Sequence, residues 1–288
     1  MSFIAVILSL LLDRILRHLQ FLRGPRWFHA YFESLGLFAH SRGFWRATAG
    51  ALVIVLVPAV VVLFLGHLLD HIWGAFGFAY AVFILLVTLG PQDLHAQAEE
   101  YIKAAQSGNA GHANQLAREL LGTEPPPEDA ACSEAITRAV LCEANDRLFG
   151  ILFWFAVLGP AGAVLYRSAD FLHRLPAEAG QSNEFIAAVA RLYGVLAWIP
   201  AHLVAIGYAF AGSFEEAVSD IKSYYANCTL RFFQVNNDVL VCTGLGALHS
   251  SAAEAGTVRV RSALMLVWRT LIIWLVVYGL IALFGWTW

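Results

Sequence analysis

Four polar side chains cluster near the middle of the chain, directly before a long apolar run. They are Glu143, Asn145, Asp146 and Arg147. The run that follows, residues 148–166, carries no charged side chain. Carboxylates three residues apart, such as Glu143 and Asp146, share one face of a helix and can hold a divalent cation between them. The same four residues could instead line a ligand pocket, so we expect the chemistry of the chain to be concentrated here.

Further polar side chains lie at or inside the apolar runs. Arg167 and Asp170 follow the first run, and Trp198 and His202 lie in a second uncharged run at residues 192–212. An ionisable residue inside a membrane is a functional candidate by default, although a neutral, hydrogen-bonded histidine is the commoner state. The predicted ligand-binding residues are Glu143, Asn145, Asp146, Arg147, Arg167, Asp170, Trp198 and His202.

The same residues have a purely structural interpretation. In that alternative, Arg147 and Arg167 form ion pairs with Asp146 and Asp170 at the entry of a helix into the membrane, and no ligand binds. No catalytic residue is predicted in either interpretation of this polar set.

The composition is that of an integral membrane protein. Hydrophobic residues make up 59% of the 288 residues, charged residues only 14%, and the mean hydropathy is +0.65. A soluble domain carries about 25% charged residues. The net charge of −3, with no basic patch, argues against a nucleic-acid partner. We therefore predict a single membrane domain over residues 1–288, with the lipid bilayer as its principal partner.

The cysteines and histidines form no metal-binding pattern. The four cysteines lack CxxC spacing, so free thiols in a reducing compartment are favoured over a disulfide. His67 and His71 lie four residues apart, with Asp70 between them, but two histidines alone make a weak site. We predict no bound metal and no resident cofactor.

Five apolar segments are long enough to enter or cross a bilayer. They are residues 48–69, 72–89, 148–166, 192–212 and 263–286. Because Gly159-Pro160 and Pro200 interrupt two of these segments, 148–166 and 192–212 could also be re-entrant. The predicted fold is an all-α polytopic helical bundle with about five crossings, in a range of about four to six.

The N-terminal residues 1–22 are predicted to form an interfacial helix. Their uncharged part is too short for an ordinary crossing, and Asp13, Arg14 and Arg17 interrupt the apolar pattern. These three side chains would lie at the lipid interface. A sixth crossing is the alternative.

Residues 91–147 form a polar insert with ten acidic and four basic groups. Its apolar stripe and its glycines predict a helix that starts at Pro91 and is stopped by Gly108 to Gly111. A second helix is predicted from His112 to Leu121, and the two together make an αα-hairpin. Basic residues gather in the insert and in residues 13–47 and 213–262, which places the insert in the cytoplasm of the inner membrane. The insert offers a surface to a protein partner, and a homo-oligomer is also open.

Four blocks of sequence carry a family resemblance. They are Leu11-Leu12-Asp13-Arg14, ANDRLFGILFWFAVLGP (Ala144 to Pro160), Leu165-Tyr166-Arg167 and VLAWIPAHL (Val195 to Leu203). Together and in this order they resemble AmpE, an inner-membrane family of Gram-negative bacteria. AmpE is similar in turn to the CobD/CbiB adenosylcobinamide-phosphate synthases. The resemblance covers essentially the whole chain.

The two branches imply different functions. AmpE implies a sensor or signal modulator that acts beside the amidase AmpD in inducing the AmpC β-lactamase. The synthases join an amine to a corrinoid carboxylate with ATP and Mg²⁺. Their motif has Glu-Asn before an Asp and then Pro-Leu-Phe. Asp146 and Phe153 keep their places here, but Cys142 and Glu143 replace Glu-Asn, and Ile151 replaces the proline.

The sequence departs from the two family patterns at two further places, and both bear on the choice between a sensor and a synthase. Residues 170–175 replace an Asn-Thr-Leu-Asp-Ser-Met run of the synthases, which removes polar groups for metal and phosphate. His202 stands where AmpE usually has an arginine. We predict a non-enzymatic sensor whose ligand pocket faces the cytoplasm and moves the insert. The alternative is an ATP/Mg²⁺-dependent amide- or phosphate-transferring enzyme, with Glu143 and Asp146 around the ion.

Overall fold

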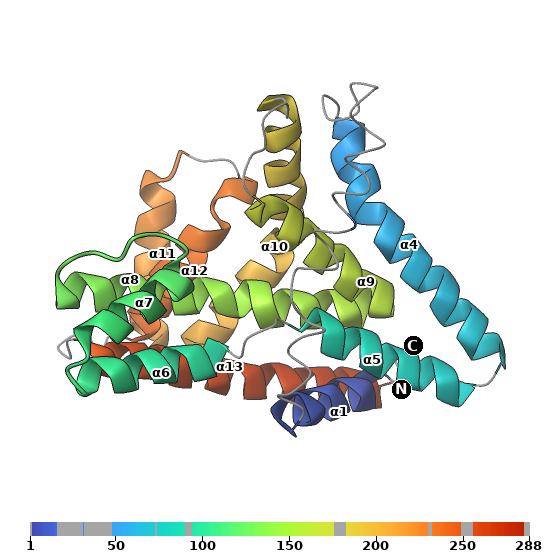
Figure 1. Cartoon of the computed structure of the whole chain (residues 1–288), viewed down its shortest axis with the longest axis horizontal. Coiled ribbons are helices and arrows are strands. Elements are labelled where there is room, and N and C mark those ends of the chain that lie inside the picture. Colours follow the sequence, from blue (N-terminus) through green and yellow to red (C-terminus); the bar gives the residue numbers. More distant parts are fainter. Residues whose placement is uncertain are drawn as a thin grey trace. The chain divides into compact units, whose positions relative to one another are not determined.

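The computed structural model describes residues 2–15, 31, 48–72, 74–89, 94–175, 183–229, 232–248 and 256–284. The regular elements in these ranges are all helical (Figure 1). They are α1 (Ser2–Ile15), α4 (Thr48–Ile72), α5 (Gly74–Thr88), α6 (Leu94–Gln106), α7 (Ala110–Leu121), α8 (Asp129–Ala144), η3 (Asn145–Phe149), α9 (Gly150–Arg174), α10 (Asn183–Ala211), α11 (Phe214–Asn227), η4 (Phe232–Gln234), α12 (Asn236–Ala247) and α13 (Thr257–Leu283). The predicted all-α polytopic fold is confirmed.

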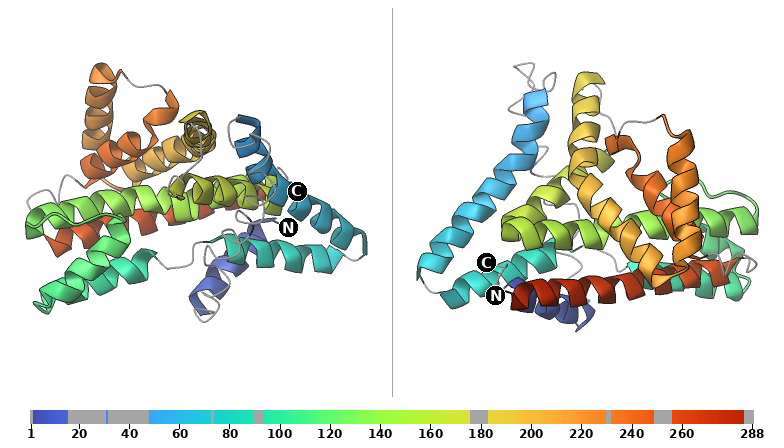
Figure 2. Two further views of the ribbon diagram at one scale, coloured as in Figure 1. Left: turned by 45° about the horizontal axis from the view of Figure 1, so that its top comes forward. Right: turned by 180° about the vertical axis from the view of Figure 1, so that it is seen from behind.

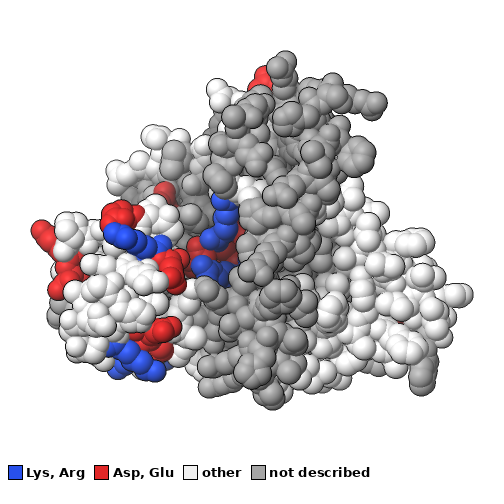
Figure 3. All heavy atoms as spheres, viewed as in Figure 1, with Lys and Arg blue, Asp and Glu red and all other residues white. Residues whose placement is uncertain are grey.

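Within the described residues, four helical stretches are long and apolar enough to cross a membrane. They are Thr48–Ile72, Asp129–Arg174, Asn183–Ala211 and Thr257–Leu283. The apolar helices Phe3–Leu12 and Gly74–Thr88 are shorter. On the face shown in Figure 3, the surface over α4 and α5 carries almost no charged side chains, whereas charged side chains gather over α6–α8. Large exposed apolar surfaces of this kind are typical of a membrane-embedded helix.

The chain divides into two compact units. The first contains residues 1–91, 150–197 and 279–288, and the second contains residues 92–149 and 198–278. The predicted insert thus falls in one unit together with α11, α12 and most of α13. Its status as an insert within a single membrane domain stays a prediction.

In the first unit, α4 and α5 form a hairpin, drawn as a V in Figure 1, and both pack against α9. The Tyr80 hydroxyl donates to the Val62 carbonyl at 3.1 Å and links the two arms. Helix α1 packs on α5, where the Ser9 hydroxyl donates to the Val82 carbonyl at 3.4 Å. The core of this unit contains Ala51, Ile54, Val55, Ala169, Leu172, Phe185, Ala188 and Val189.

The N-terminal helix is present, but its predicted interfacial side chains are only partly placed. Asp13 and Arg14 lie in α1, where the structure describes the backbone and not these side chains. Arg17 lies outside the described residues. The interfacial position of all three stays a prediction.

Helix α9 reverses its direction at Gly159. This residue has φ 68° and ψ −155°, which is not helical. A Cβ atom at Gly150 would lie 2.3 Å from Cζ of Tyr166, although a straight helix would separate these positions by about 24 Å. The apolar run at 148–166 therefore folds back on itself. Its first arm, residues 150–158, covers only about 13 Å, too short to cross the hydrocarbon core alone.

In the second unit, the predicted αα-hairpin is confirmed by α6 and α7, which pack against each other and against α8. Asn109 caps α7 by accepting a hydrogen bond from the His112 amide, and Gly122 ends it in the left-handed conformation. The other half of the unit contains α11 and α12, which lie side by side in both views of Figure 2. The Tyr224 hydroxyl donates to Asp238 at 2.8 Å and connects these two helices.

The backbone angles of Gly159 give the first prediction. They lie in a region open essentially only to glycine, so Gly159→Ala should destabilise the protein by about 1–3 kcal/mol. Gly74→Ala is the matched control, because a Cβ there would meet nothing within 4 Å and φ is not positive. The measurement is thermal unfolding in detergent, and equal transition temperatures for the two variants would contradict the reversal.

Candidate functional site

The predicted polar residues 143–147 lie where the helix changes type. Helix α8 ends at Ala144, the π-helical turn η3 occupies Asn145–Phe149, and α9 begins at Gly150. π-Turns are rare and are frequently found at functional sites. The turn therefore marks this segment as a candidate site independently of its composition.

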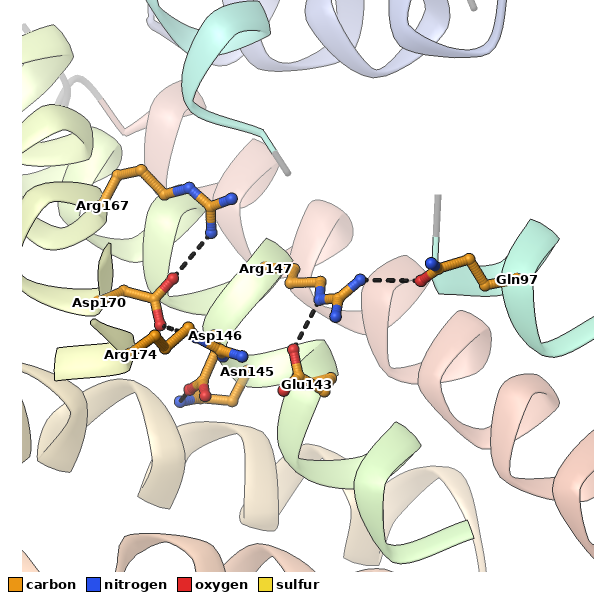
Figure 4. Close-up of polar contacts among 8 residues, drawn as sticks. All are labelled: Gln97, Glu143, Asn145, Asp146, Arg147, Arg167, Asp170 and Arg174. Carbon is orange, nitrogen blue, oxygen red and sulfur yellow. Dashed lines mark hydrogen bonds and ion pairs between the residues drawn. The ribbon is translucent and has the colours of Figure 1, made fainter. Parts of the chain in front are cut away.

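An ion pair fixes Arg147 beside the π-turn. Its Nε donates to Oε2 of Glu143 at 2.6 Å, and its Nη1 donates to Oε1 of Gln97 in α6 at 3.0 Å (Figure 4). The side chains of Arg147 and Glu143 are only 18% and 16% exposed. An arginine held at two of its nitrogens keeps its guanidinium plane in one orientation, which suits it to recognise an anion.

Asn145 and Asp146 are buried in the same turn, with 1% and 7% of their surface exposed. The Asn145 amide donates to Oδ1 of Asp146 at 3.1 Å. The Tyr208 hydroxyl of α10 donates to the Leu141 carbonyl at 2.9 Å, one helical turn before this pair. A carboxylate at this depth is costly unless it is bound by polar groups, so its presence calls for a function.

In the first unit, Asp170 lies between two arginines of α9. Arg167 Nη1 donates to its Oδ2 at 2.8 Å, and Arg174 Nε donates to its Oδ1 at 2.5 Å (Figure 4). Arg167 and Asp170 are both buried, and the Arg167 guanidinium also lies 4.2 Å from the centre of the Phe171 ring. The predicted Arg167–Asp170 pair is present, whereas Arg147 pairs with Glu143 rather than with Asp146.

Trp198 and His202 lie together in α10. His202 Nδ1 is 2.8 Å from the Trp198 carbonyl, which can only accept, so this nitrogen carries the proton. Nε2 lies 2.9 Å from the Tyr225 hydroxyl of α11, and in a neutral ring it accepts from that hydroxyl. Burial, and then the nearby Cys228, raise the pKa of Tyr225, which keeps the phenol protonated as the donor. The expected neutral, hydrogen-bonded histidine fits this geometry.

Several contributors to these clusters were not predicted. Arg174 follows Asp170 by four residues, a spacing that the sequence displays. Gln97 and Tyr225 come from other helices, 50 and 23 residues from their partners, and no local pattern indicates them. Among the described residues no group of three or more His, Cys, Asp or Glu could hold a metal, and the four cysteines are free.

Comparison with known proteins identifies relatives. A family model described as CobD/Cbib protein matches residues 6–261. A protein of Chromobacterium violaceum named "Cobalamin biosynthesis protein CobD" is 36% identical over 140 residues, which cover 46% of this chain and 43% of the relative. A protein of the same name from Stutzerimonas stutzeri is 28% identical over 182 residues, 62% of this chain and 59% of the relative. The chain thus spans about half the length of these curated relatives, and no solved structure matches.

These matches correct the functional prediction. The CobD/CbiB part of the resemblance is confirmed, whereas the AmpE assignment finds no support. The prediction of a non-enzymatic sensor in β-lactamase induction is wrong, because the relatives are named for cobalamin biosynthesis, and an enzymatic role is favoured instead. That prediction depended on the loss of polar groups at residues 170–175, yet Asp170 and Arg174 form an ion pair within this segment.

The ion pair beside the π-turn gives the second prediction. Arg147→Met leaves the poorly exposed Glu143 without its arginine and should destabilise the protein by about 3 kcal/mol. Arg138→Met is the control, because Arg138 and Glu134 form an i,i+4 pair in α8 with 51% and 44% exposure, and its loss should cost less than about 1 kcal/mol. If a denaturant titration gave equal losses of unfolding free energy for the two variants, the Arg147–Glu143 pair would contribute no more than an exposed pair.

Proposed function

The chain belongs to the CobD/Cbib family, and from this premise we propose that it is a membrane enzyme of cobalamin biosynthesis. The proposed reaction joins an amine to a carboxylate of a corrinoid and uses ATP to activate that carboxylate. This is the activity implied by the resemblance to adenosylcobinamide-phosphate synthases. A reaction of this kind forms one C–N bond and releases the activating phosphate from the carboxyl carbon.

The observation that supports this proposal most strongly is the buried Asp146 on the π-turn. It lies at the end of the polar helix α8 and at the start of the apolar helix α9. A catalytic step that excludes water but admits a polar substrate needs a boundary of this kind. Asp146 is also one of the residues that keep their place in the synthase motif.

The proposed reaction implies Mg²⁺, and the described residues fit a shared site better than a site built by protein alone. Mg²⁺ in nucleotide enzymes is usually held by one or two carboxylates together with phosphate oxygens. Asp146 and the side-chain oxygen of Asn145 are the groups that would hold it. The ion, when bound, would neutralise phosphate charge. Glu143 is less suited than expected, since it is bonded to Arg147.

Arg147 has a separate role in the proposal. We assign it to the anionic part of the substrate, because Glu143 and Gln97 orient its guanidinium before any ligand arrives. Pre-orientation of a binding group reduces the entropy that is lost on binding. In the first unit, Asp170 holds Arg167 and Arg174 by hydrogen bonds, and no role in binding the substrate is assigned to them.

We also propose the inner membrane as the location, with residues 91–147 in the cytoplasm. The distribution of basic residues supports this orientation, because cytoplasmic loops carry an excess of lysine and arginine. ATP is available on that side, which agrees with the proposed chemistry. Both relatives come from bacteria, which supports a bacterial membrane.

The proposal predicts a specific loss in Asp146→Asn. This variant keeps the size of the side chain but removes its charge, and the ATP-dependent formation of the corrinoid amide should fall about a hundredfold or more. Asp129→Asn is the control, because Asp129 is an exposed carboxylate in the first turn of α8, the helix that leads into the π-turn. The measurement is amide product formed by membranes containing each variant, supplied with Mg²⁺-ATP, a corrinoid acid and an amine.

Three outcomes are informative. Loss of product only in Asp146→Asn supports both the reaction and the site. Full activity in Asp146→Asn would refute the site while keeping the reaction. Absence of product with well-folded wild-type protein, together with failure to restore growth of a bacterium that lacks its own amide-forming step, would refute the reaction.

A further inference from the structure

A side chain of α9 supplies a hydrogen bond that the backbone of α10 lacks because of a proline. Pro200 lies inside α10 and has no N–H, so the carbonyl of Leu196, four residues earlier, loses its donor within the helix. Trp154 Nε1 donates to this carbonyl at 3.0 Å. In an apolar medium, where water cannot replace a lost donor, such a carbonyl must find a partner in the protein.

The same chemistry recurs in α4, which shows that the contact is not an isolated coincidence. Pro58 lies inside α4 and removes the donor for the Ile54 carbonyl. The Tyr31 hydroxyl donates to that carbonyl at 3.3 Å. Pro160 needs no such partner in the helix, because it follows the reversal at Gly159 and begins a new arm, where an N–H is dispensable.

The position of Trp154 gives its hydrogen bond a mechanical consequence. Trp154 lies in the middle of the arm 150–158, which has the π-turn η3 at one end and the non-helical Gly159 at the other. Both ends are helix defects, where the chain can change direction more easily than in a regular helix. The backbone of the arm packs tightly on the second arm, because a Cβ at Gly162 would lie 2.2 Å from the Trp154 carbonyl.

We propose that Trp154 is a conformational latch for α10. By this we mean that its hydrogen bond to the Leu196 carbonyl, the group that Pro200 leaves without a donor, holds α10 in one conformation at Pro200. Its indole N–H fixes the local geometry of α10 at Pro200 and fixes the arm 150–158 that follows the π-turn. When this bond opens, α10 can change its bend at Pro200 more easily than at a residue with an N–H, because Pro200 itself donates no backbone hydrogen bond. Trp154 is thus a positioning residue, and the inference does not depend on which reaction the protein catalyses.

A double-mutant cycle tests the latch. Trp154→Phe removes the donor and keeps an aromatic ring, whereas Pro200→Ala returns a backbone N–H that can donate to Leu196 directly. The readout is amide hydrogen exchange of peptides covering residues 194–206 in the full-length protein in lipid nanodiscs. With Pro200 present, Trp154→Phe should accelerate exchange there about tenfold. In the Pro200→Ala background, the same change should alter exchange less than about twofold.

Controls separate a latch from general stabilisation. Trp268→Phe removes an indole of α13 that is 51% exposed, and it should leave exchange at residues 194–206 unchanged. The latch is refuted if Trp154→Phe has the same effect in both backgrounds, or if it accelerates exchange uniformly along the chain.

A second measurement covers the case in which Trp154→Phe does not fold. The indole ¹⁵N–H signal of Trp154 can be compared between wild type and Pro200→Ala, both of which retain the tryptophan. Competition from the restored backbone N–H should shift this signal toward that of a non-bonded indole. An unchanged signal would mean that the bond to Leu196 does not respond to the proline, and the proposal would fail.

Discussion

The described fold depends on one constraint, namely that a polar backbone group inside a membrane must find its partner within the protein. Proline breaks this rule locally in α4 and α10, and an aromatic donor from another segment restores it each time. These two hydrogen bonds do more than satisfy a carbonyl group. Each one joins two segments at a defined point, Tyr31 to α4 and the first arm of α9 to α10, and so contributes to the tertiary structure of the first unit.

The same constraint governs the charged side chains. Glu143 with Arg147, and Asp170 with two arginines, are partly or wholly removed from water, and each charge has a partner of opposite sign. Such pairs seldom add stability compared with apolar residues of similar size, because desolvation offsets the attraction. Their retention in apolar helices is better explained by a task that needs fixed charge, such as holding an anionic substrate.

How far the sequence predicts this structure depends on whether the signal is local. Composition and apolar runs predict the polytopic helical class, and Gly159-Pro160 marks the place where α9 reverses. The Arg147–Glu143 pair has the i,i+4 spacing of a helical ion pair, although Asp146 was the partner predicted for Arg147. Gln97 and Tyr225 reach their partners through tertiary packing that no periodicity encodes. The functional prediction failed for a related reason, because it considered the motif residues missing at 170–175 without the contact between Arg174 and Asp170.

The π-turn η3 leads directly into the arm 150–158, which carries Trp154. One additional residue in a helical turn rotates every following side chain by about 100° relative to a regular helix. The turn at Asn145–Phe149 therefore changes the register of the chain where α8 passes into α9. Within the first unit, Trp154 supplies the Leu196 carbonyl with the donor that Pro200 lacks, and water inside an apolar medium could not replace that donor.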